Sequence, residues 1–204
     1  MMVFALSGKA YSGKDTAGKI LVEDFGFVRY AFADALKDCA LASDPYVMVN
    51  MAKVTSHSPF VRLSSLVQEV GWDEAKKEAD VRRFLQRMGT EMGREIISPT
   101  VWIDIVCNKI MRDLPEKVVI TDCRFANEVD GLRNMSINPH VVSIRLERKS
   151  ASTIKAHSSE ELSFRTERVI KNDGFISNLK ESLKWLLFVE GQKLERLKRR
   201  SIDA

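Results

Sequence analysis

Short apolar runs alternate with longer amphipathic segments along most of the chain. Runs rich in branched apolar and aromatic residues predict buried strands at residues 2–6, 27–32, 117–122, 140–146 and 169–173. Apolar spacings of three and four predict helices at residues 15–25, 63–70, 72–79, 81–97, 100–112 and 176–191. Such alternation favours an α/β fold, with a parallel sheet and helices on both of its faces.

Length and composition favour one folded domain. The chain has 204 residues, of which 45% are hydrophobic, and this is enough for a single layered core. We find no internal repeat, low-complexity tract or interdomain linker. We therefore expect one domain over residues 1–204, with a basic tail at residues 192–204.

Charge and cysteine content argue against several classes of protein. There are 32 basic and 28 acidic residues, a net charge of +4 that suits an anionic ligand but does not by itself indicate nucleic acid. Glu195 interrupts the basic tail and no aromatic residue is interleaved with it, so we expect no nucleic-acid partner. The three cysteines form no C-x-x-C pair, which argues against a disulfide framework or a zinc site and favours a reducing, cytosol-like compartment.

Membrane and export signals are not expected. The first residues lack a basic n-region and run directly into a glycine-bounded loop, so we do not interpret them as a signal peptide. No apolar run approaches 18 residues, which argues against a membrane span.

The segment from Gly8 to Thr16 carries the clearest chemistry. It reads Gly-Lys-Ala-Tyr-Ser-Gly-Lys-Asp-Thr and joins the first predicted strand to the first predicted helix. That context is typical of a P-loop, whose backbone N–H groups and helix N-terminus bind phosphate while the lysine reaches the β- and γ-phosphates. The predicted ATP-binding residues are Gly8, Ser12, Gly13, Lys14, Asp15 and Thr16.

One position departs from the general P-loop pattern. Asp15 stands directly after the lysine, where Ser or Thr is usual, and the hydroxyl comes one residue later at Thr16. This Gly-Lys-x-Thr ending resembles nucleoside monophosphate kinases of the adenylate kinase type, which implies that Thr16 lies beside Mg²⁺. Asp15 is the alternative, through a hydrogen bond to a ligand or to a water on the metal.

A second candidate metal ligand ends the strand at residues 117–122. A hydrophobic strand that ends in a carboxylate, here Asp122, resembles a Walker B element that holds Mg²⁺ directly or through water. Arg124 follows two residues later. It is either fixed by Asp122 or Glu128, or free to contact phosphate.

Cations on two other segments suit a second anion. Asp34 and Lys37 follow the second predicted strand, where they are either ligand contacts or a capping carboxylate and a solvated amine. In the helix predicted at residues 81–97, one stripe combines cations with an amide and a hydroxyl: Arg83, Gln86, Arg87, Thr90 and Arg94. This stripe either grips a phosphate and a base edge or is a solvated face paired with nearby glutamates.

Two further residues have alternative roles. Trp102 is either a core residue or part of a base pocket, since it begins the helix that follows the arginine stripe. Arg148 comes first after the strand at residues 140–146, where a nucleotide kinase carries a mobile lid. It is therefore our preferred lid arginine, with a solvated basic surface as the alternative.

Taken together, these motifs resemble the deoxynucleoside monophosphate kinases of bacteriophages. The specific parts are Leu-Gln-x-x-Gly-Thr-Glu at residues 85–91 and Asp-x-Arg-Phe-x-Asn-Glu at residues 122–128, and the similarity extends over roughly residues 3–188. It implies a three-layer P-loop NTPase fold with an acceptor-binding helical insert at about residues 44–98 and a lid at about residues 147–166. It also implies acceptor-site residues, namely Asp34, Lys37, Arg82, Arg83, Gln86, Arg94, Trp102 and Glu128.

The resemblance implies transfer of the ATP γ-phosphoryl group to a deoxynucleoside 5′-monophosphate, with Mg²⁺ as cofactor. The acceptor oxygen is already ionised at neutral pH, so catalysis would come from positioning and charge neutralisation, by Lys14, Arg148 and Arg124. It also implies location in the host-cell cytoplasm and a possible homodimer. Two other functions remain open: a related small-molecule kinase acting on phosphomevalonate or dephospho-coenzyme A, and a regulatory P-loop ATPase.

Overall fold

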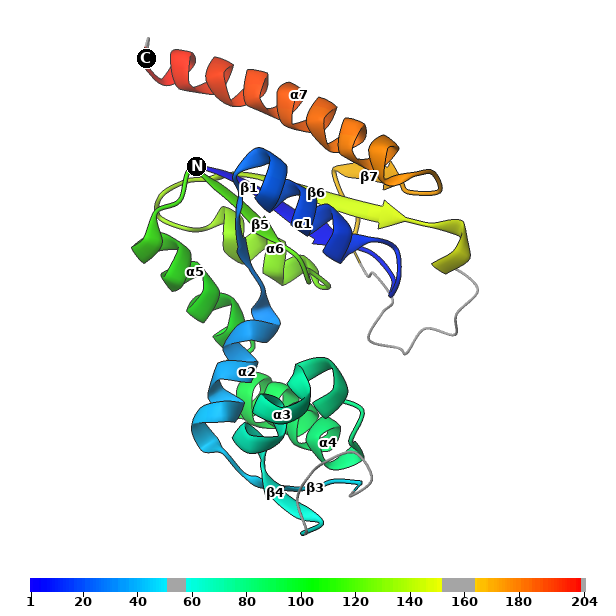
Figure 1. Cartoon of the computed structure of the whole chain (residues 1–204). Helices are drawn as coiled ribbons and strands as arrows, with labels where there is room; N and C mark the ends of the chain where they lie inside the picture. The colour runs from blue at the N-terminus through cyan, green and yellow to red at the C-terminus, as the bar shows by residue number, and fades with distance from the viewer. Residues whose placement is uncertain (51–57, 152–163, 203–204) are drawn as a thin grey trace. The chain divides into compact units, whose positions relative to one another are not determined.

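The computed structural model describes residues 1–50, 58–151 and 164–202 and separates into two compact units (Figure 1). We call residues 1–32 with 106–204 the core unit, and residues 33–105 the insert unit. The expected lid at residues 147–166 and the end of the tail lie partly outside the described residues. Among the helices that are described, none combines the length and apolar character needed to cross a bilayer.

A five-stranded parallel sheet forms the centre of the core unit. Its strands are β1 (Met2–Ser7), β2 (Val28–Tyr30), β5 (Lys117–Ile120), β6 (His140–Glu147) and β7 (Arg168–Lys171). Their order is β2-β5-β1-β6-β7, and every neighbouring pair is parallel. All six residues of β1 are buried because the strand has a neighbour on each side and helices on both faces.

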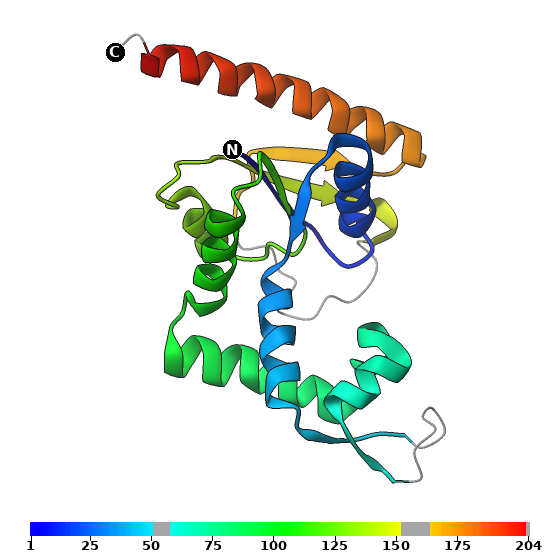
Figure 2. The same ribbon diagram turned by 60° about the vertical axis from the view of Figure 1, so that its left-hand side comes forward.

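Helices cover both faces of this sheet, as Figures 1 and 2 show. On one face lie α1 (Lys14–Phe25) and α7 (Ile176–Ile202), and on the other lie α6 (Ala126–Arg133) and the core-unit part of α5 (Val101–Asp113). The α1 and α7 side contains a buried cluster that includes Phe4, Leu21, Ile144 and Leu183. The predicted three-layer α/β fold is thereby confirmed.

Several boundaries in the core unit differ from the prediction. Strand β2 is shorter than residues 27–32 because α2 (Phe32–Ser43) already begins at Phe32, whose N–H donates to the Asp122 carboxylate at 2.9 Å. Strand β5 ends at Ile120, before Asp122. Helix α6 was not predicted, and α7 continues past residue 191 through the basic tail to Ile202.

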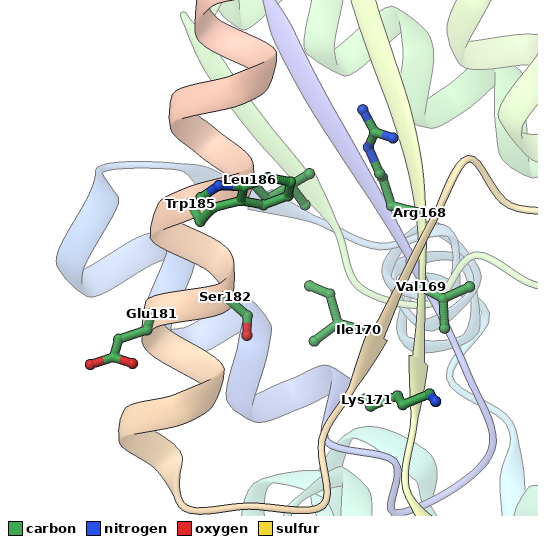
Figure 3. Close-up of a pocket in the computed structure, with 8 residues that line it drawn as sticks. All are labelled: Arg168, Val169, Ile170, Lys171, Glu181, Ser182, Trp185 and Leu186. Carbon is green, nitrogen blue, oxygen red and sulfur yellow. The ribbon is translucent and has the colours of Figure 1, made fainter.

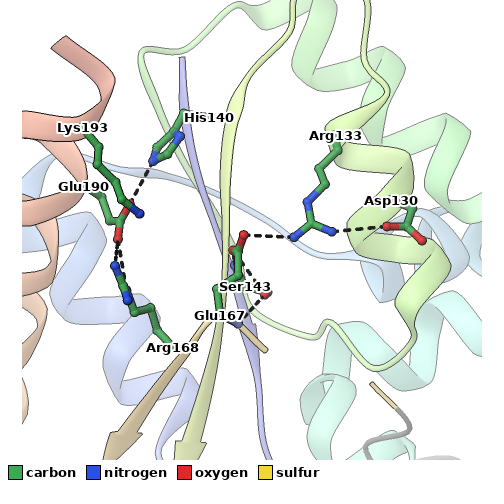
Figure 4. A network of polar contacts seen from close by, with 8 residues as sticks. All are labelled: Asp130, Arg133, His140, Ser143, Glu167, Arg168, Glu190 and Lys193. Carbon is green, nitrogen blue, oxygen red and sulfur yellow. Dashed lines mark hydrogen bonds and ion pairs between the residues drawn. The ribbon is translucent and has the colours of Figure 1, made fainter. Parts of the chain in front are cut away.

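A buried carboxylate ties α7 to the sheet in the core unit (Figure 4). Glu190 is 1% exposed and accepts hydrogen bonds from Arg168 of β7 at 2.6 and 3.0 Å and from Lys193 at 3.3 Å. Its other contact is His140 of β6, at 3.0 Å. Burial alone would raise the pKa of Glu190, but the hydrogen bonds from Arg168, His140 and Lys193 together lower it, so the carboxylate stays charged.

The insert unit has its own small core. The bounds of its elements beyond α2 are β3 (Tyr46–Met48), β4 (Phe60–Arg62), α3 (Leu63–Ala75), α4 (Ala79–Arg87) and the π-helix η2 (Met88–Ile97). The buried cluster includes Val47, Leu63, Leu66, Val81 and Met88. The antiparallel pair β3–β4 was not predicted. Helix α3 is interrupted at Gly71, where φ is 76° and ψ is 165°, so it consists of two short helical segments on either side of Gly71, as predicted, although the second ends at Ala75 and not at residue 79.

The prediction of one regular α-helix at residues 81–97 was wrong in its second half. From Met88 onward the backbone is a π-helix, and after its end the Ser98 N–H still donates to the carbonyl of Gly93, five residues earlier, at 2.9 Å. A π-helix has more residues per turn than an α-helix, so apolar residues spaced by about 3.6 positions no longer lie on one face of the helix. Met92 and Ile96, which continue the apolar spacing of four from Met88, are 37% and 79% exposed.

Candidate active site

The glycine-bounded loop between β1 and α1 depends on its two terminal glycines. Gly8 has φ +148° and Gly13 has φ +100°, a range that side chains with a Cβ rarely adopt. A Cβ on Gly8 would lie 2.5 Å from the Leu146 carbonyl oxygen, and one on Gly13 would lie 2.2 Å from the Asn172 amide nitrogen. The backbone therefore turns tightly against β6 and the end of β7, as a P-loop requires.

Lys14 folds back over this loop. Its Nζ donates to the carbonyl oxygens of Gly8 at 2.6 Å and Lys9 at 2.8 Å. The ammonium group is thus held across the mouth of the loop, close to where the backbone N–H groups would receive a phosphate. Ser12 lies at the base of the loop, 1% exposed, and within the described residues its hydroxyl has no hydrogen-bond partner.

Asp122 lies at the same edge of the sheet as the loop. The backbone segment after β5 runs beside the end of β1, since the Cys123 N–H donates to the Leu6 carbonyl at 3.1 Å. Helix α1 packs closely here, because a Cβ on Gly18 would lie 2.7 Å from the Thr121 methyl carbon. The carboxylate of Asp122 therefore stands at the carboxyl end of a strand adjacent to the P-loop strand, the position that a Walker B aspartate needs.

Thr16 and Asp122 could both serve a magnesium ion. Thr16 is an exposed hydroxyl in the first turn of α1, and Asp122 is a half-buried carboxylate. Mg²⁺ prefers oxygen ligands and is commonly held by one or two protein groups together with substrate phosphates. In the part of the chain that is described, no group of three or more His, Cys, Asp or Glu side chains forms an all-protein metal cage. The two oxygen ligands therefore suit a magnesium ion that substrate phosphates also coordinate, and not an ion enclosed by protein ligands alone.

Glu128 has a different environment from the one expected for an acceptor contact. It is 2% exposed, and its carboxylate accepts hydrogen bonds from the N–H groups of Arg124 at 2.6 Å and Phe125 at 3.0 Å. These contacts fix the turn into α6, while the side chain of Arg124 is exposed. A contact between Glu128 and a nucleotide stays a prediction. What the structure shows is that Glu128 holds the backbone of the loop after Asp122.

Cys123 is unsuited to nucleophilic chemistry. Burial, followed by the nearby negative charges of Glu128 and Asp122, raises the pKa of its thiol well above the ordinary value. The thiol is therefore protonated at neutral pH and acts as a small packing group.

The segment that leads toward the expected lid begins at the end of β6. Arg148 is exposed and precedes one turn of 3₁₀-helix, η3 (Lys149–Ala151). Beyond residues 152–163, which are outside the described structure, the Phe164 carbonyl accepts a hydrogen bond from the Arg145 guanidinium of β6. Arg148 thus stands at the predicted place in the chain, and its contact with phosphate stays a prediction.

Two predicted acceptor residues lie on α2 of the insert unit. The Lys37 Nζ is 3.5 Å from the Asp34 carboxylate and 5.9 Å from the centroid of the Trp72 ring. Both side chains are partly buried, and Lys37 is 21% exposed. They form an ion pair, so Lys37 is not the solvated amine of the earlier alternative, and a contact of either residue with a ligand stays a prediction.

The arginine stripe of α4 is partly engaged with neighbouring carboxylates. Arg83 pairs with Asp80 at 2.5 Å, and Arg87 pairs with Glu91 at 3.1 Å. Arg82, Gln86 and the paired arginines are all exposed, whereas Arg94 on η2 is half-buried. Exposed ion pairs contribute little to stability, so a phosphate could displace them at small cost.

Trp102 supports η2. It is 5% exposed, and its indole N–H donates to the Gly89 carbonyl at 2.9 Å. A Cβ on Gly93 would lie 2.6–2.8 Å from three atoms of its ring, and one on Gly89 would lie 3.1 Å from Leu36 of α2. Gly89, the first residue of the Gly-Thr-Glu motif, therefore lies where η2 contacts both α2 and α5. Contact of Trp102 with a base stays a prediction.

A model of the deoxynucleotide monophosphate kinase family matches residues 47–183, about two thirds of the chain. The chain belongs to this family. The family resemblance predicted from the motifs is thereby confirmed.

Named relatives agree with this assignment. The deoxynucleoside-5′-monophosphate kinase of Escherichia phage T5 is 33% identical over 106 residues, which cover 48% of this chain and 42% of that enzyme. A protein of Acanthamoeba polyphaga mimivirus, described as "Putative deoxynucleotide monophosphate kinase", is 29% identical over 178 residues, or 78% of this chain and 81% of that protein. Among solved structures, a gluconokinase from Sinorhizobium meliloti has a TM-score of 0.49 at 12% identity, covering 98% of this chain and 97% of that one.

The sequence analysis assigned no role to Asn172, which lies in the strand predicted at residues 169–173. It is 6% exposed, and its side chain donates to the Ser12 carbonyl in the P-loop at 3.0 Å. The contact joins residues 160 positions apart, which no local pattern could reveal. The sequence did contain one signal for a functional residue here, namely a polar side chain directly after the end of a buried strand.

An open groove of about 520 Å³ lies between β7 and α7 (Figure 3). Ile170 and Lys171 line it from the strand, and Trp185 and Leu186 from the helix. None of the predicted site residues lines this groove, so it forms no part of the candidate active site.

Proposed function

We propose that this chain transfers the γ-phosphoryl group of ATP to deoxynucleoside 5′-monophosphates, giving the diphosphates and ADP for DNA precursor synthesis. One observation carries the proposal. The loop from Gly8 to Thr16, with Lys14 lying across it, is at the same edge of the sheet as Asp122, in a chain that belongs to the deoxynucleotide monophosphate kinase family. Since the match to the phage T5 enzyme spans less than half of either chain, the acceptor must be established by experiment.

The P-loop would bind the triphosphate. Its backbone N–H groups and the N-terminus of α1 suit the phosphate oxygens, and the Lys14 ammonium, which donates to the Gly8 and Lys9 carbonyls beside them, would turn toward the phosphates. Thr16 and Asp122 would hold Mg²⁺, which, when bound, supplies neutralisation of charge on the β- and γ-phosphates.

The remaining chemistry needs no general base. The attacking group is a phosphate oxygen that is already ionised at neutral pH, so alignment and charge neutralisation suffice. The exposed guanidinium groups of Arg148 and Arg124 are the candidates to stabilise charge that develops during transfer. Losing one such contact typically lowers kcat about 10²–10³-fold.

The insert unit would bind the acceptor nucleotide. Its exposed or half-buried cations on α4 and η2 suit a monophosphate, and the amide of Gln86 suits a base edge. The candidate residues are those predicted from the sequence: Asp34, Lys37, Arg82, Arg83, Gln86, Arg94 and Trp102. We further propose action in the cytoplasm of the host cell, no nucleic-acid partner and a possible homodimer, which size-exclusion chromatography with light scattering would detect.

A coupled assay of ADP release tests the function directly. All four deoxynucleoside monophosphates, the four ribonucleoside monophosphates, phosphomevalonate and dephospho-coenzyme A are each supplied with ATP and Mg²⁺. We expect saturable turnover with one or more deoxynucleotides, which Lys14→Ala abolishes while circular dichroism remains that of the wild type. Turnover with only the other acceptors, ATP hydrolysis without any acceptor, or a fully active Lys14→Ala variant would contradict the proposal.

A further inference from the structure

The loop after β7 reaches across the sheet edge to the P-loop. Asn172 continues the pairing of β7 with β6, because its backbone N–H donates to the Glu147 carbonyl at 2.7 Å. Its side chain turns the other way and donates to the Ser12 carbonyl at 3.0 Å. A carbonyl oxygen can only accept, so the amide nitrogen must be the atom that faces Ser12.

This contact controls the orientation of one peptide group. The Ser12 carbonyl and the Gly13 N–H belong to the same planar trans peptide, and they point in opposite directions. Holding the carbonyl against the buried Asn172 amide therefore directs the Gly13 N–H away from the sheet, toward the ligand side of the loop. The fit is close, because a Cβ on Gly13 would lie 2.2 Å from the Asn172 amide nitrogen.

The peptide needs such an external support. Gly13 has φ +100° and no Cβ, so its own conformational preference does not select one peptide orientation. The Ser12 N–H is bonded to the Lys9 carbonyl at 3.2 Å, which fixes the peptide before the one in question. Asn172 supplies the corresponding restraint for the Ser12–Gly13 peptide from a different strand.

The next residue extends this link to the segment after β6. The Asp173 carboxylate accepts a hydrogen bond from the Lys149 N–H at 2.7 Å, at the first residue of η3. The Asn172–Asp173 pair therefore fixes the P-loop and the start of the segment that carries Arg148 to the same short loop.

We propose that Asn172 is a positioning residue that orients the Gly13 N–H for the triphosphate. It acts through the P-loop backbone and does not itself contact the nucleotide. The inference rests on the proposed function only for the nature of the ligand, a nucleoside triphosphate. Without the Asn172 amide the Ser12 carbonyl loses its donor, and the peptide is free to rotate, which weakens ATP binding in particular.

The test is calorimetric titration of the full chain with ATP and Mg²⁺ in the absence of acceptor, and separately with dGMP and dTMP. The variants are Asn172→Ala and Asn172→Leu, the second being close in size and uncharged but unable to donate. Asn178→Ala is the matched control: the side-chain oxygen Oδ1 of Asn178 accepts from the Phe175 N–H at 3.0 Å at the start of α7, so its loss lowers stability without touching the P-loop.

We expect both Asn172 variants to bind ATP about ten-fold or more weakly, with monophosphate affinities within about two-fold of the wild type. Asn178→Ala should bind all these nucleotides as the wild type does. If Asn172→Ala does not fold, Asn172→Leu alone decides the question. ATP affinity within two-fold of the wild type in a folded Asn172 variant overturns the proposal, as does an equal weakening of ATP and monophosphate binding.

The result is separable from the proposed function. A wild-type chain that binds ATP but phosphorylates no deoxynucleotide refutes the acceptor assignment, while the ATP titrations still decide the role of Asn172. A wild-type chain that binds no ATP overturns both.

Discussion

Replacing Gly93 with alanine tests the contact that holds η2 against α5. Gly93 is buried in the π-helix, and a Cβ added there would lie 2.6, 2.8 and 2.8 Å from Cζ2, Cε2 and Nε1 of Trp102. The indole cannot easily withdraw, since it is 5% exposed and hydrogen-bonded to the Gly89 carbonyl. The substitution therefore forces either the ring or the helix to move.

Two opposing contributions set the size of the effect. Overpacking of a well-packed site typically costs about 1–3 kcal/mol. Replacing a helical glycine by alanine returns about 0.5–1 kcal/mol, since alanine loses less backbone entropy on folding. Because the clash involves three atoms of a rigid ring, we expect the clash to dominate, with a net loss of about 1–2 kcal/mol.

The chain supplies its own control for that calculation. Gly191 lies within α7, and a Cβ there would meet nothing within 4 Å. Gly191→Ala should therefore show the entropic gain alone, a stabilisation of about 0.5–1 kcal/mol. The free energy of unfolding of both variants is measured by urea denaturation, followed by circular dichroism and tryptophan fluorescence.

A substitution at Trp102 tests whether the loss of stability in Gly93→Ala comes from the clash with the indole ring. In Trp102→Leu no side-chain atom takes the place of the three ring atoms that clash, so Gly93→Ala should cost less there, and a double-mutant cycle measures the difference. If Gly93→Ala stabilises the protein as much as Gly191→Ala does, the described packing of Trp102 on η2 is wrong.

Two further predictions concern the acceptor site and acid stability. Arg94→Ala should raise KM for the deoxynucleotide at least about ten-fold more than KM for ATP, whereas Arg112→Ala, which breaks an exposed pair with Asp113 on α5, should leave both nearly unchanged; equal effects on the two KM values would remove Arg94 from the acceptor site. The pKa of Glu190 lies below its ordinary value of 4.5, so its contribution to stability is present above pH 4.5 and is lost as the pH falls through the lowered folded-state pKa. Glu190→Gln should thus cost about 2 kcal/mol near pH 7 and progressively less in acid, as urea titrations between pH 3 and pH 7 would show; a penalty independent of pH would contradict this assignment.

The shape of the glycine-bounded loop could be predicted because its determinants are local, while its binding of phosphate stays a prediction. Strand, loop and helix N-terminus lie within residues 2–25, and each of Gly8, Gly13 and Lys14 has a role fixed by its neighbours in sequence. Asp122 could be placed because a buried strand that ends in a carboxylate has few positions in a parallel sheet. These predictions required no knowledge of which strands are neighbours.

The elements that were missed depend on contacts distant in sequence. Strands β3 and β4 have three residues each, too short to show an alternating pattern, and they pair with each other across a gap of 11 residues. Asn172 acquires its role only from Ser12, which is brought beside it by the order of β1, β6 and β7. The fold had to be known before these residues could be assigned.

The π-helix changes how the arginine stripe must be interpreted. Arg83, Gln86 and Arg87 lie on α4, where spacings of three and four do place side chains on one face. Arg94 lies beyond Met88, where hydrogen bonds span five residues, so its spacing of eleven from Arg83 no longer puts it on that face. Its half-buried position supports the same conclusion, since the other arginines of the stripe are exposed. The α4 residues and Arg94 must therefore be tested as separate contacts, and π-helices often occur at functional sites because such a change of register re-aims side chains.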